Sequence, residues 1–134
     1  MLLALDVGNT NITVGLFDGR RLVESWRHQT LPRSEVAGLG RELAAAAHRR
    51  KARVDSAVYA SVVPSLDSAL QRAVRKEFSC RVLAVTPRSR VGMRLRVKTP
   101  LEVGADRMLN ALAAFELAGG PAVVIDFGTA TTFD

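Results

Sequence analysis

The chain has 134 residues, of which 48% are hydrophobic and 5% aromatic. This length supplies one ordinary hydrophobic core, which favours a single domain over two. Nineteen Lys and Arg residues against thirteen Asp and Glu leave a formal net charge of +6, but the cations are scattered, so a dedicated nucleic-acid module is not the first interpretation.

The N-terminal segment predicts three β-strands. Leu2–Asp6 is a short apolar run that ends in an acid and a Gly-Asn turn, which is typical of a buried strand. Asn11–Phe17 and Arg21–His28 follow, and Asp18-Gly19 between them suits the positive φ angles of a two-residue hairpin turn. The sequence therefore predicts an antiparallel meander.

The same segment bears on the compartment. No basic stretch precedes the apolar run, and Asp6 interrupts it, so we expect neither a signal peptide nor a membrane span. Cys80 is the one cysteine and has no partner for a disulfide, which agrees with a reducing environment. A cytoplasmic protein is expected.

Helical spacing begins after the meander. Ser34 is predicted as the N-cap of a helix that runs to about Arg50. Ala57–Val63 is then a buried strand, a second helix starts at Ser65, and Arg81–Val85 is the next short strand.

The last third of the chain contains one more helix and one more strand. Thr86–Pro100 is predicted as loop and exposed strand, and Glu102–Leu117 as a helix that Gly119-Gly120-Pro121 ends. Ala122–Asp126 is predicted as a buried strand. An antiparallel meander followed by alternating strands and helices indicates an α/β fold, a mixed sheet with helices packed on it.

Two strand ends carry a similar turn, Asp6-Val7-Gly8-Asn9-Thr10 and Asp126-Phe127-Gly128-Thr129. The acid can hold a hydrated Mg²⁺ or another cation, Gly lets the backbone approach a phosphate, and Asn or Thr adds a donor. A single Asp-x-Gly is a common turn. Two copies, each after a predicted buried strand, indicate a polyphosphate site held from two sides.

Gly104-Ala105-Asp106-Arg107 opens the third predicted helix. Asp106 can accept a hydrogen bond from a substrate hydroxyl, and Arg107 can meet a carboxylate or phosphate through its planar fork. Asn110 lies one turn later on the same helix face and can join that site. A helix start with an acid in its first turn and a surface Arg explains these residues as well, so both interpretations stay open.

The densest basic runs are Arg49–Arg53, at a predicted helix end, and Arg88–Lys98, where cations alternate with apolar residues. Cations are favoured at a helix C-terminus, and an alternating segment has one wet face, so both runs are interpreted as solvated faces. A small anionic ligand and a nucleic acid are the alternatives.

These motifs resemble those of type III pantothenate kinases, within the acetate and sugar kinase/Hsp70/actin superfamily. The matching segments cover the chain in this order: Asp6–Thr13, Ser61–Pro64, Pro100–Ala111 and Asp126–Asp134. The resemblance implies an RNase H-like (actin-like ATPase) fold and ATP-dependent phosphorylation of pantothenate to 4′-phosphopantothenate, the first step of coenzyme A synthesis. The alternative is a nucleotide-binding regulatory protein of the same family, of the accessory transcription factor type, without kinase turnover.

The resemblance also implies residue roles. Pantothenate would be bound by Gly104, Ala105, Asp106 and Arg107, with Asp106 as the proton acceptor. Asp126 would bind a monovalent cation, K⁺ or NH₄⁺, and Mg²⁺ would accompany ATP. ATP would be bound by Thr129 and by the first phosphate loop, which consists of Asp6, Val7, Gly8, Asn9, Thr10, Asn11, Ile12 and Thr13.

The same comparison suggests a domain organisation. Residues 1–120 are expected to form an actin-like ATPase domain, and residues 121–134 the first hairpin of a second, truncated one. Members of the family work as dimers, so a homodimer is expected, without nucleic-acid or membrane partners. Many members have a substrate-lining Tyr where Val97 stands here. We expect the 134-residue chain alone to have little kinase activity and a mobile C-terminus.

Overall fold

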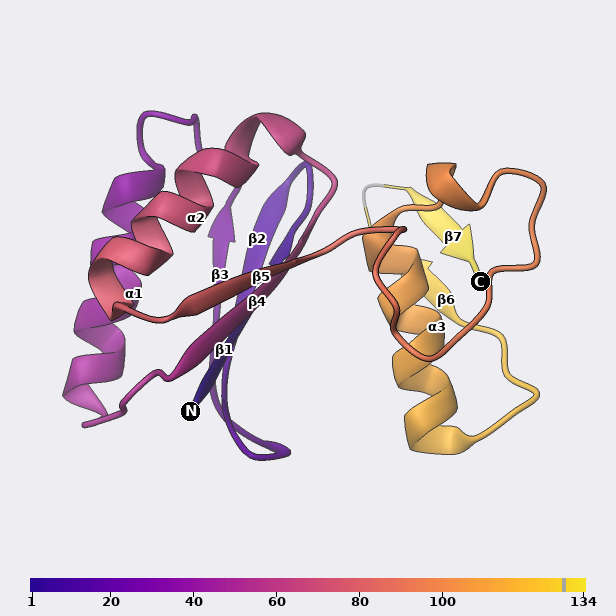
Figure 1. Ribbon diagram of the computed structural model, residues 1–134, viewed down its shortest axis with the longest axis horizontal. Helices are drawn as coiled ribbons and strands as arrows, with labels where there is room; N and C mark the ends of the chain where they lie inside the picture. The colour runs from indigo at the N-terminus through magenta and orange to yellow at the C-terminus, as the bar shows by residue number, and fades with distance from the viewer. Residues whose placement is uncertain (129) are drawn as a thin grey trace. The chain divides into compact units, whose positions relative to one another are not determined.

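Five strands of the N-terminal part form one sheet in the order β3-β2-β1-β4-β5 in the computed structural model (Figure 1). The structure describes residues 1–128 and 130–134, which divide into the units Met1–Ala84 and Val85–Asp134. The two units are taken in turn below. In the described part of the chain, no helix has both the length and the apolar character that a membrane crossing requires.

The sheet is mixed, as predicted, because β1 has an antiparallel neighbour in β2 and a parallel neighbour in β4. β3 extends the meander by antiparallel pairing with β2. The strands are β1 (Leu2–Val7), β2 (Asn11–Asp18), β3 (Arg21–Gln29), β4 (Ser56–Ser61) and β5 (Arg81–Val85).

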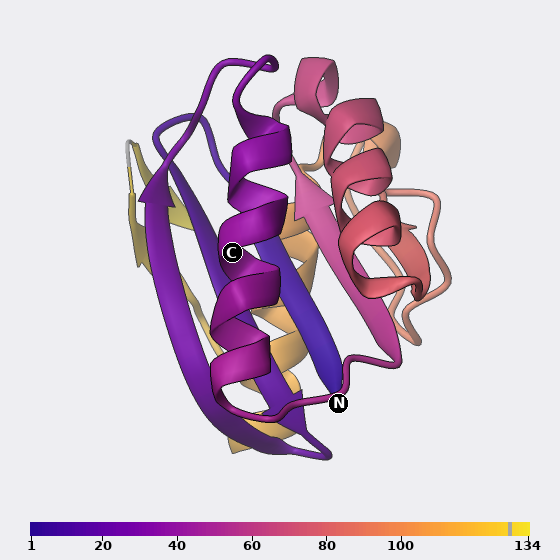
Figure 2. The ribbon, with the colours of Figure 1, turned by 90° about the vertical axis from the view of Figure 1, so that its left-hand side faces the viewer.

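Two helices, α1 (Val36–Arg49) and α2 (Pro64–Phe78), cover one face of this sheet (Figure 2). Alternation along the strands sends every second side chain toward them, and helical spacing returns apolar side chains to the sheet. The helices approach closely: a Cβ built on Gly40 would lie 3.0 Å from the Cβ of Ala73. The core includes Leu3, Leu5, Val7, Ile12, Val14, Leu16, Leu39, Leu43, Leu70 and Val74.

Several predicted boundaries in this unit were wrong by one or two residues; for example, β4 ends at Ser61 and not at Val63. The β2–β3 turn is Gly19-Arg20, because Asp18 still pairs with Arg21 and Gly19 takes the positive φ of 59°. α1 begins at Val36, with Glu35 at the capping position and no side-chain cap, so Ser34 is not the N-cap. α2 begins one residue before the predicted Ser65, since Pro suits the first helical position.

The second unit contains a short 3₁₀ helix, one α-helix and a hairpin. They are η1 (Pro100–Glu102), α3 (Ala105–Ala118), β6 (Ile125–Phe127) and β7 (Thr131–Phe133).

Three predictions in this unit were wrong. The helix predicted from Glu102 starts at Ala105, after η1, and no strand forms among residues 86–99. The strand predicted to be buried over Ala122–Asp126 is reduced to Ile125–Phe127 (β6), and it is exposed, with Ile125 49% and Phe127 81% accessible. Most of this apolar run is therefore accessible to solvent, although Val124 is half-buried.

An ion pair joins the start of β1 to the segment before β4. The N-terminal ammonium of Met1 donates to Asp55 Oδ2 at 2.6 Å and to the Arg53 carbonyl at 2.8 Å. The hydrogen bond from this ammonium lowers the pKa of Asp55 below its ordinary value of 3.8, and Arg53 adds to the effect. A carboxyl whose pKa is depressed in the folded state stabilises the fold above its unfolded pKa, and this contribution is lost as the pH falls through the folded value.

Asp55→Asn is therefore expected to melt at a lower temperature than the parent protein at pH 6, because the amide cannot carry the charge that pairs with Met1. The gap should close as the pH falls below about 4, where the parent carboxyl takes up its proton. Thermal unfolding of both proteins from pH 3 to pH 7 measures this difference in melting temperature. A gap that stays constant over that range would contradict the assigned ion pair.

Candidate functional site

The turn between β1 and β2 holds the first predicted phosphate loop. The Gly8 N–H donates to the Asn11 carbonyl at 2.9 Å, which closes a tight turn over residues 8–11. A Cβ on Gly8 would lie 3.1 Å from the same carbonyl oxygen, so this position favours glycine. The turn thus presents backbone close to its surface, as a phosphate loop requires.

Thr30, just after β3, fastens this turn and was missed in the sequence analysis. Its Oγ1 donates to the Gly8 carbonyl at 2.6 Å, and its N–H donates to the Thr10 carbonyl at 2.9 Å. The strand register could have found it, since Asn11 pairs with Gln29 and the residue that follows β3 must then lie opposite Thr10.

The eight predicted loop residues divide by the face they occupy. Val7 and Ile12 are each 1% exposed and point into the core, so only their backbone groups are available to a ligand. Asn11 and Gly8 are half-buried. The side chains exposed to solvent are those of Asp6, Asn9, Thr10 and Thr13.

The end of β4 lies beside the end of β1, because Val7 pairs with Ser61 in the parallel ladder. Ser61 Oγ accepts the Val63 N–H at 3.0 Å just before α2 begins, and the Val62 N–H donates to the Val7 carbonyl at 3.0 Å. Ser61 therefore shapes the start of α2. The neighbouring carboxyl ends of β1 and β4 are the usual ligand-binding edge of α/β sheets.

The second unit positions Asp106 in the first turn of α3. The helix is anchored there by Ala105 and Met108, which are 3% and 2% exposed, and the Met108 N–H donates to the Gly104 carbonyl at 3.2 Å. Asp106 Oδ1 is buried and has no hydrogen-bond partner in the described part of the chain. A buried carboxylate oxygen without a partner is costly, and a donor from a substrate would satisfy it.

α3 is tied to the β6–β7 hairpin by two side chains one turn apart. Arg107 Nε and Nη2 both contact Asp134 Oδ1, and Nη2 also donates to the Phe133 carbonyl at 3.0 Å. Asn110 Nδ2 donates to Asp126 Oδ2 at 3.2 Å. Of the predicted residues, Asp106 and Arg107 therefore lie on α3, and Asp126 lies on the hairpin that α3 contacts.

Two further residues were predicted as ligands, Asp126 for a cation and Thr129 for ATP. Asp126 is exposed and uses one carboxylate oxygen for Asn110; no group of three His, Cys, Asp or Glu side chains among the described residues could hold a metal ion. A monovalent cation at Asp126 stays a prediction. Thr129 lies outside the described residues.

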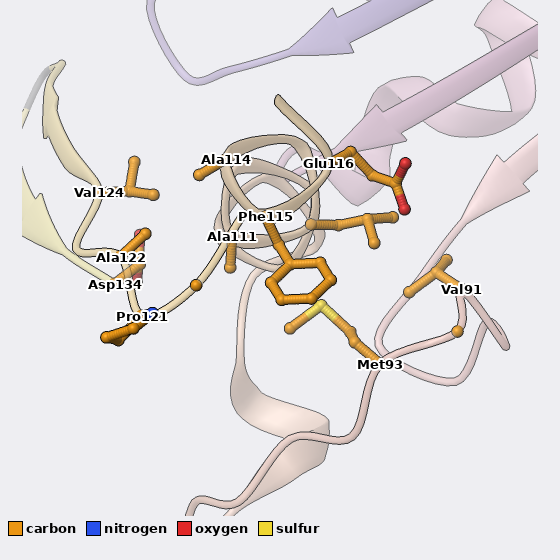
Figure 3. A pocket seen from close by; sticks show the side chains of 13 residues that line it. Val91, Met93, Ala111, Ala114, Phe115, Glu116, Pro121, Ala122, Val124 and Asp134 are labelled. Carbon is orange, nitrogen blue, oxygen red and sulfur yellow. The ribbon is translucent and has the colours of Figure 1, made fainter. Parts of the chain in front are cut away.

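An open pocket of about 500 Å³ lies beside the later turns of α3 (Figure 3). Met93 and Phe115 lie next to each other on one side of it, and Pro121 lies on the other. Its lining is mainly apolar, and the acids Glu116 and Asp134 are its charged residues. The pocket offers no cluster of donors for a phosphate, so the candidate residues remain those of the β1–β2 turn in the first unit and, in the second unit, those of the start of α3 and of the β6–β7 hairpin.

A comparison with protein families matches residues 2–134 to the family described as type III pantothenate kinase. A type III pantothenate kinase of Moorella thermoacetica is 44% identical over the whole chain, which covers 54% of that relative. The chain spans about half the length of the curated relatives it matches.

Solved structures show the fold. A Ppx/GppA family member of Aquifex aeolicus superposes with a TM-score of 0.53 at 14% identity, over 98% of this chain and 45% of its own. A Porphyromonas gingivalis protein described as an N-acetylglucosamine kinase gives 0.52 at 17% identity, over 63% and 33%. These likenesses carry the fold alone, and they confirm the predicted actin-like ATPase, RNase H-like class.

Proposed function

Because the chain belongs to the type III pantothenate kinase family, we propose that it supplies the ATP loop and the acceptor site of an enzyme that phosphorylates pantothenate to 4′-phosphopantothenate. The product would enter coenzyme A synthesis. The observation that carries this proposal is Asp106 Oδ1, a buried and unpartnered carboxylate oxygen in the first turn of α3. A substrate hydroxyl is the donor that would satisfy it.

Asp106 would act by orienting that hydroxyl. Phosphoryl transfer passes through a loose transition state, so the hydroxyl proton leaves late and a strongly basic group is not required. Holding the hydroxyl oxygen in line with the terminal phosphate of ATP is the larger contribution. Arg107, Gly104 and Ala105 would complete the acceptor site.

The turn over Asp6–Thr13 would receive the ATP phosphates. Gly8 lets the phosphate approach the backbone, Asn9 and Thr10 offer exposed donors, and Thr30 holds the turn in place. The exposed carboxylates of Asp6 and Asp126 are the oxygen ligands that Mg²⁺ and K⁺ prefer. When bound, Mg²⁺ neutralises phosphate charge. Thr129 would also contact ATP.

Other parts of the proposal come from the family resemblance: a cytoplasmic homodimer, a domain boundary after residue 120, and K⁺ or NH₄⁺ at Asp126. Our test of the function is an ATP-consumption assay coupled to ADP release, with pantothenate as acceptor, in K⁺ and in Na⁺ buffers. It should be run on the natural gene product that carries this sequence and on the 134-residue chain. Turnover that requires pantothenate and increases in K⁺ is expected for the gene product.

Two outcomes would redirect the proposal. ATP binding without pantothenate-dependent turnover in the gene product would favour the regulatory alternative of the same family. Retention of DNA or RNA that weakens with salt but that ATP does not displace would favour a nucleic-acid function.

Gly8→Ala tests the phosphate loop directly. The added Cβ would lie 3.1 Å from the Asn11 carbonyl oxygen, which must shift by a few tenths of an ångström and distort the turn. We expect the KM for ATP to rise about tenfold, the effect of weakening one charge-assisted hydrogen bond, with the KM for pantothenate unchanged.

The matched control is Gly38→Ala in α1. Its Cβ would have no neighbour nearer than 4.0 Å, so the same change of residue is expected to leave both KM values unaltered. Equal KM values for ATP in Gly8→Ala and Gly38→Ala would rule out the loop as a phosphate-binding element.

A further inference from the structure

Arg107 does not behave as an ordinary surface arginine. Its side chain is 43% exposed, yet Nε and Nη2 both contact Asp134 Oδ1, and Nη2 also reaches the Phe133 carbonyl. One edge of the guanidinium is therefore occupied by β7 and the residue after it. In the described part of the chain no recorded contact uses Nη1, whose two N–H groups remain for another acceptor.

Asp134 is itself held firmly. Its side chain is 8% exposed, and its backbone exchanges two hydrogen bonds with Val124, at 2.9 and 2.8 Å. Thr132 Oγ1 lies 3.5 Å from the second carboxylate oxygen. An acid with so little access to water needs its partner, and that partner is the guanidinium of Arg107.

We propose that Asp134 is a positioning residue: it fixes the Arg107 guanidinium so that the Nη1 edge meets the carboxylate of the acceptor substrate. The inference rests on the proposed function. An arginine on a half-exposed helix face samples many rotamers, and holding it by its Nε–Nη2 edge fixes the direction of the remaining donors. Because Asp134 also neutralises Arg107, recognition depends on the direction of these hydrogen bonds rather than on net charge.

A purely structural role is the competing explanation, in which the pair only ties the hairpin to α3. Asn110 and Asp126 make a second tie between the same elements one turn along. The two explanations differ in which quantity changes. A structural tie contributes mainly to thermal stability, whereas a positioning residue changes the KM for pantothenate without changing the KM for ATP, and it does so only while Arg107 is present.

The test is a double-mutant cycle on the gene product in the pantothenate-dependent assay. Asp134→Ala is expected to raise the KM for pantothenate about tenfold and to change the KM for ATP by less than about twofold. Asp134→Asn, whose amide oxygen can still accept from Nε, should recover part of this loss. In an Arg107→Ala background, Asp134→Ala should add nothing. Glu116→Gln is the control: it removes an exposed acid from α3, the helix that carries Arg107, and its KM values should match those of the parent protein.

The outcomes distinguish failure of the proposed kinase function from failure of the proposed role of Asp134. No turnover in the parent protein would refute the kinase proposal itself. With parent turnover present, additive effects of Arg107→Ala and Asp134→Ala would overturn the inference, as would a lower KM for pantothenate in Asp134→Ala, which would mean that neutralisation of charge outweighs orientation. Failure of both Asp134 variants to fold, measured by thermal unfolding, would assign the residue to the fold and overturn it too.

Discussion

Asp106→Asn is expected to lower kcat about 100- to 10,000-fold, the range that a positioned acid or base contributes. The amide keeps the size of the side chain, but its NH₂ group cannot accept the hydroxyl proton and competes with the substrate as a donor. The affinity for ATP should stay within about twofold, because Asp106 is not among the residues proposed to bind ATP. Pantothenate-dependent turnover and ATP binding, measured on the same preparations, give both numbers.

Asp67→Asn is the matched control. Asp67 lies in the first turn of α2 and also has a buried Oδ1 without a partner among the described residues. Replacing it removes the same favourable contact with a helix N-terminus, which is worth about 0.3–1 kcal/mol. Both variants should lose a similar amount of stability, while only Asp106→Asn loses turnover. Parent-like turnover in Asp106→Asn would remove Asp106 from the reaction.

Gly40→Val is expected to destabilise the N-terminal unit by about 1–3 kcal/mol, the usual effect of overpacking a tight contact. A Cβ at this position would lie 3.0 Å from the Cβ of Ala73, and valine adds two methyl groups beyond it. α1 and α2 must then move apart over the sheet that they cover. Chemical unfolding followed by circular dichroism measures the loss.

The control is the same change two residues earlier. Gly38→Val places its Cβ no closer than 4.0 Å to its nearest neighbour and gains helix propensity, so its stability should equal or exceed that of the parent. Adding Ala73→Gly to Gly40→Val removes the methyl group that the new side chain meets and should restore part of the loss. Equal stability of Gly40→Val and Gly38→Val would contradict the close approach of the helices.

The sequence predicted the first unit well because its signals were local and mutually consistent. Alternation in β1 and β2 and helical spacing in α1 and α2 all send apolar side chains to one core. The errors were at the ends of elements, where any of several neighbouring residues can be the first or last residue of a helix or strand. Ser34 is a good capping residue by type, but the helix begins two residues later and uses no side-chain cap.

The second unit was predicted less well for a different reason. The apolar run before Asp126 indicates a strand, but periodicity does not show which element covers a strand, and here β6 is exposed. Pro100 begins a separate 3₁₀ turn, which the acidic and apolar residues after it do not reveal. Long-range contacts such as Arg107 with Asp134 depend on how the hairpin meets α3, which spacing along the chain does not encode.

The candidate site shows the same division. Motif spacing alone proposed Asp6, Gly8, Asp106 and Arg107, because each is part of a recognisable turn or helix start. It could not separate loop residues that face solvent from Val7 and Ile12, which face the core. Thr30 escaped because it belongs to no motif; its importance comes from the register of β3.

β1 is paired along both of its edges, and hydrogen bonds within the protein, from Gly8 to Asn11 and from Thr30 to Gly8 and Thr10, close the turn that follows it. A phosphate that meets backbone amides already in place does not have to order the loop, so little conformational entropy is lost by the protein on binding. The preorganised turn would bind the phosphates of any nucleoside triphosphate equally well. Discrimination between nucleotides must then come from contacts with the base or the ribose.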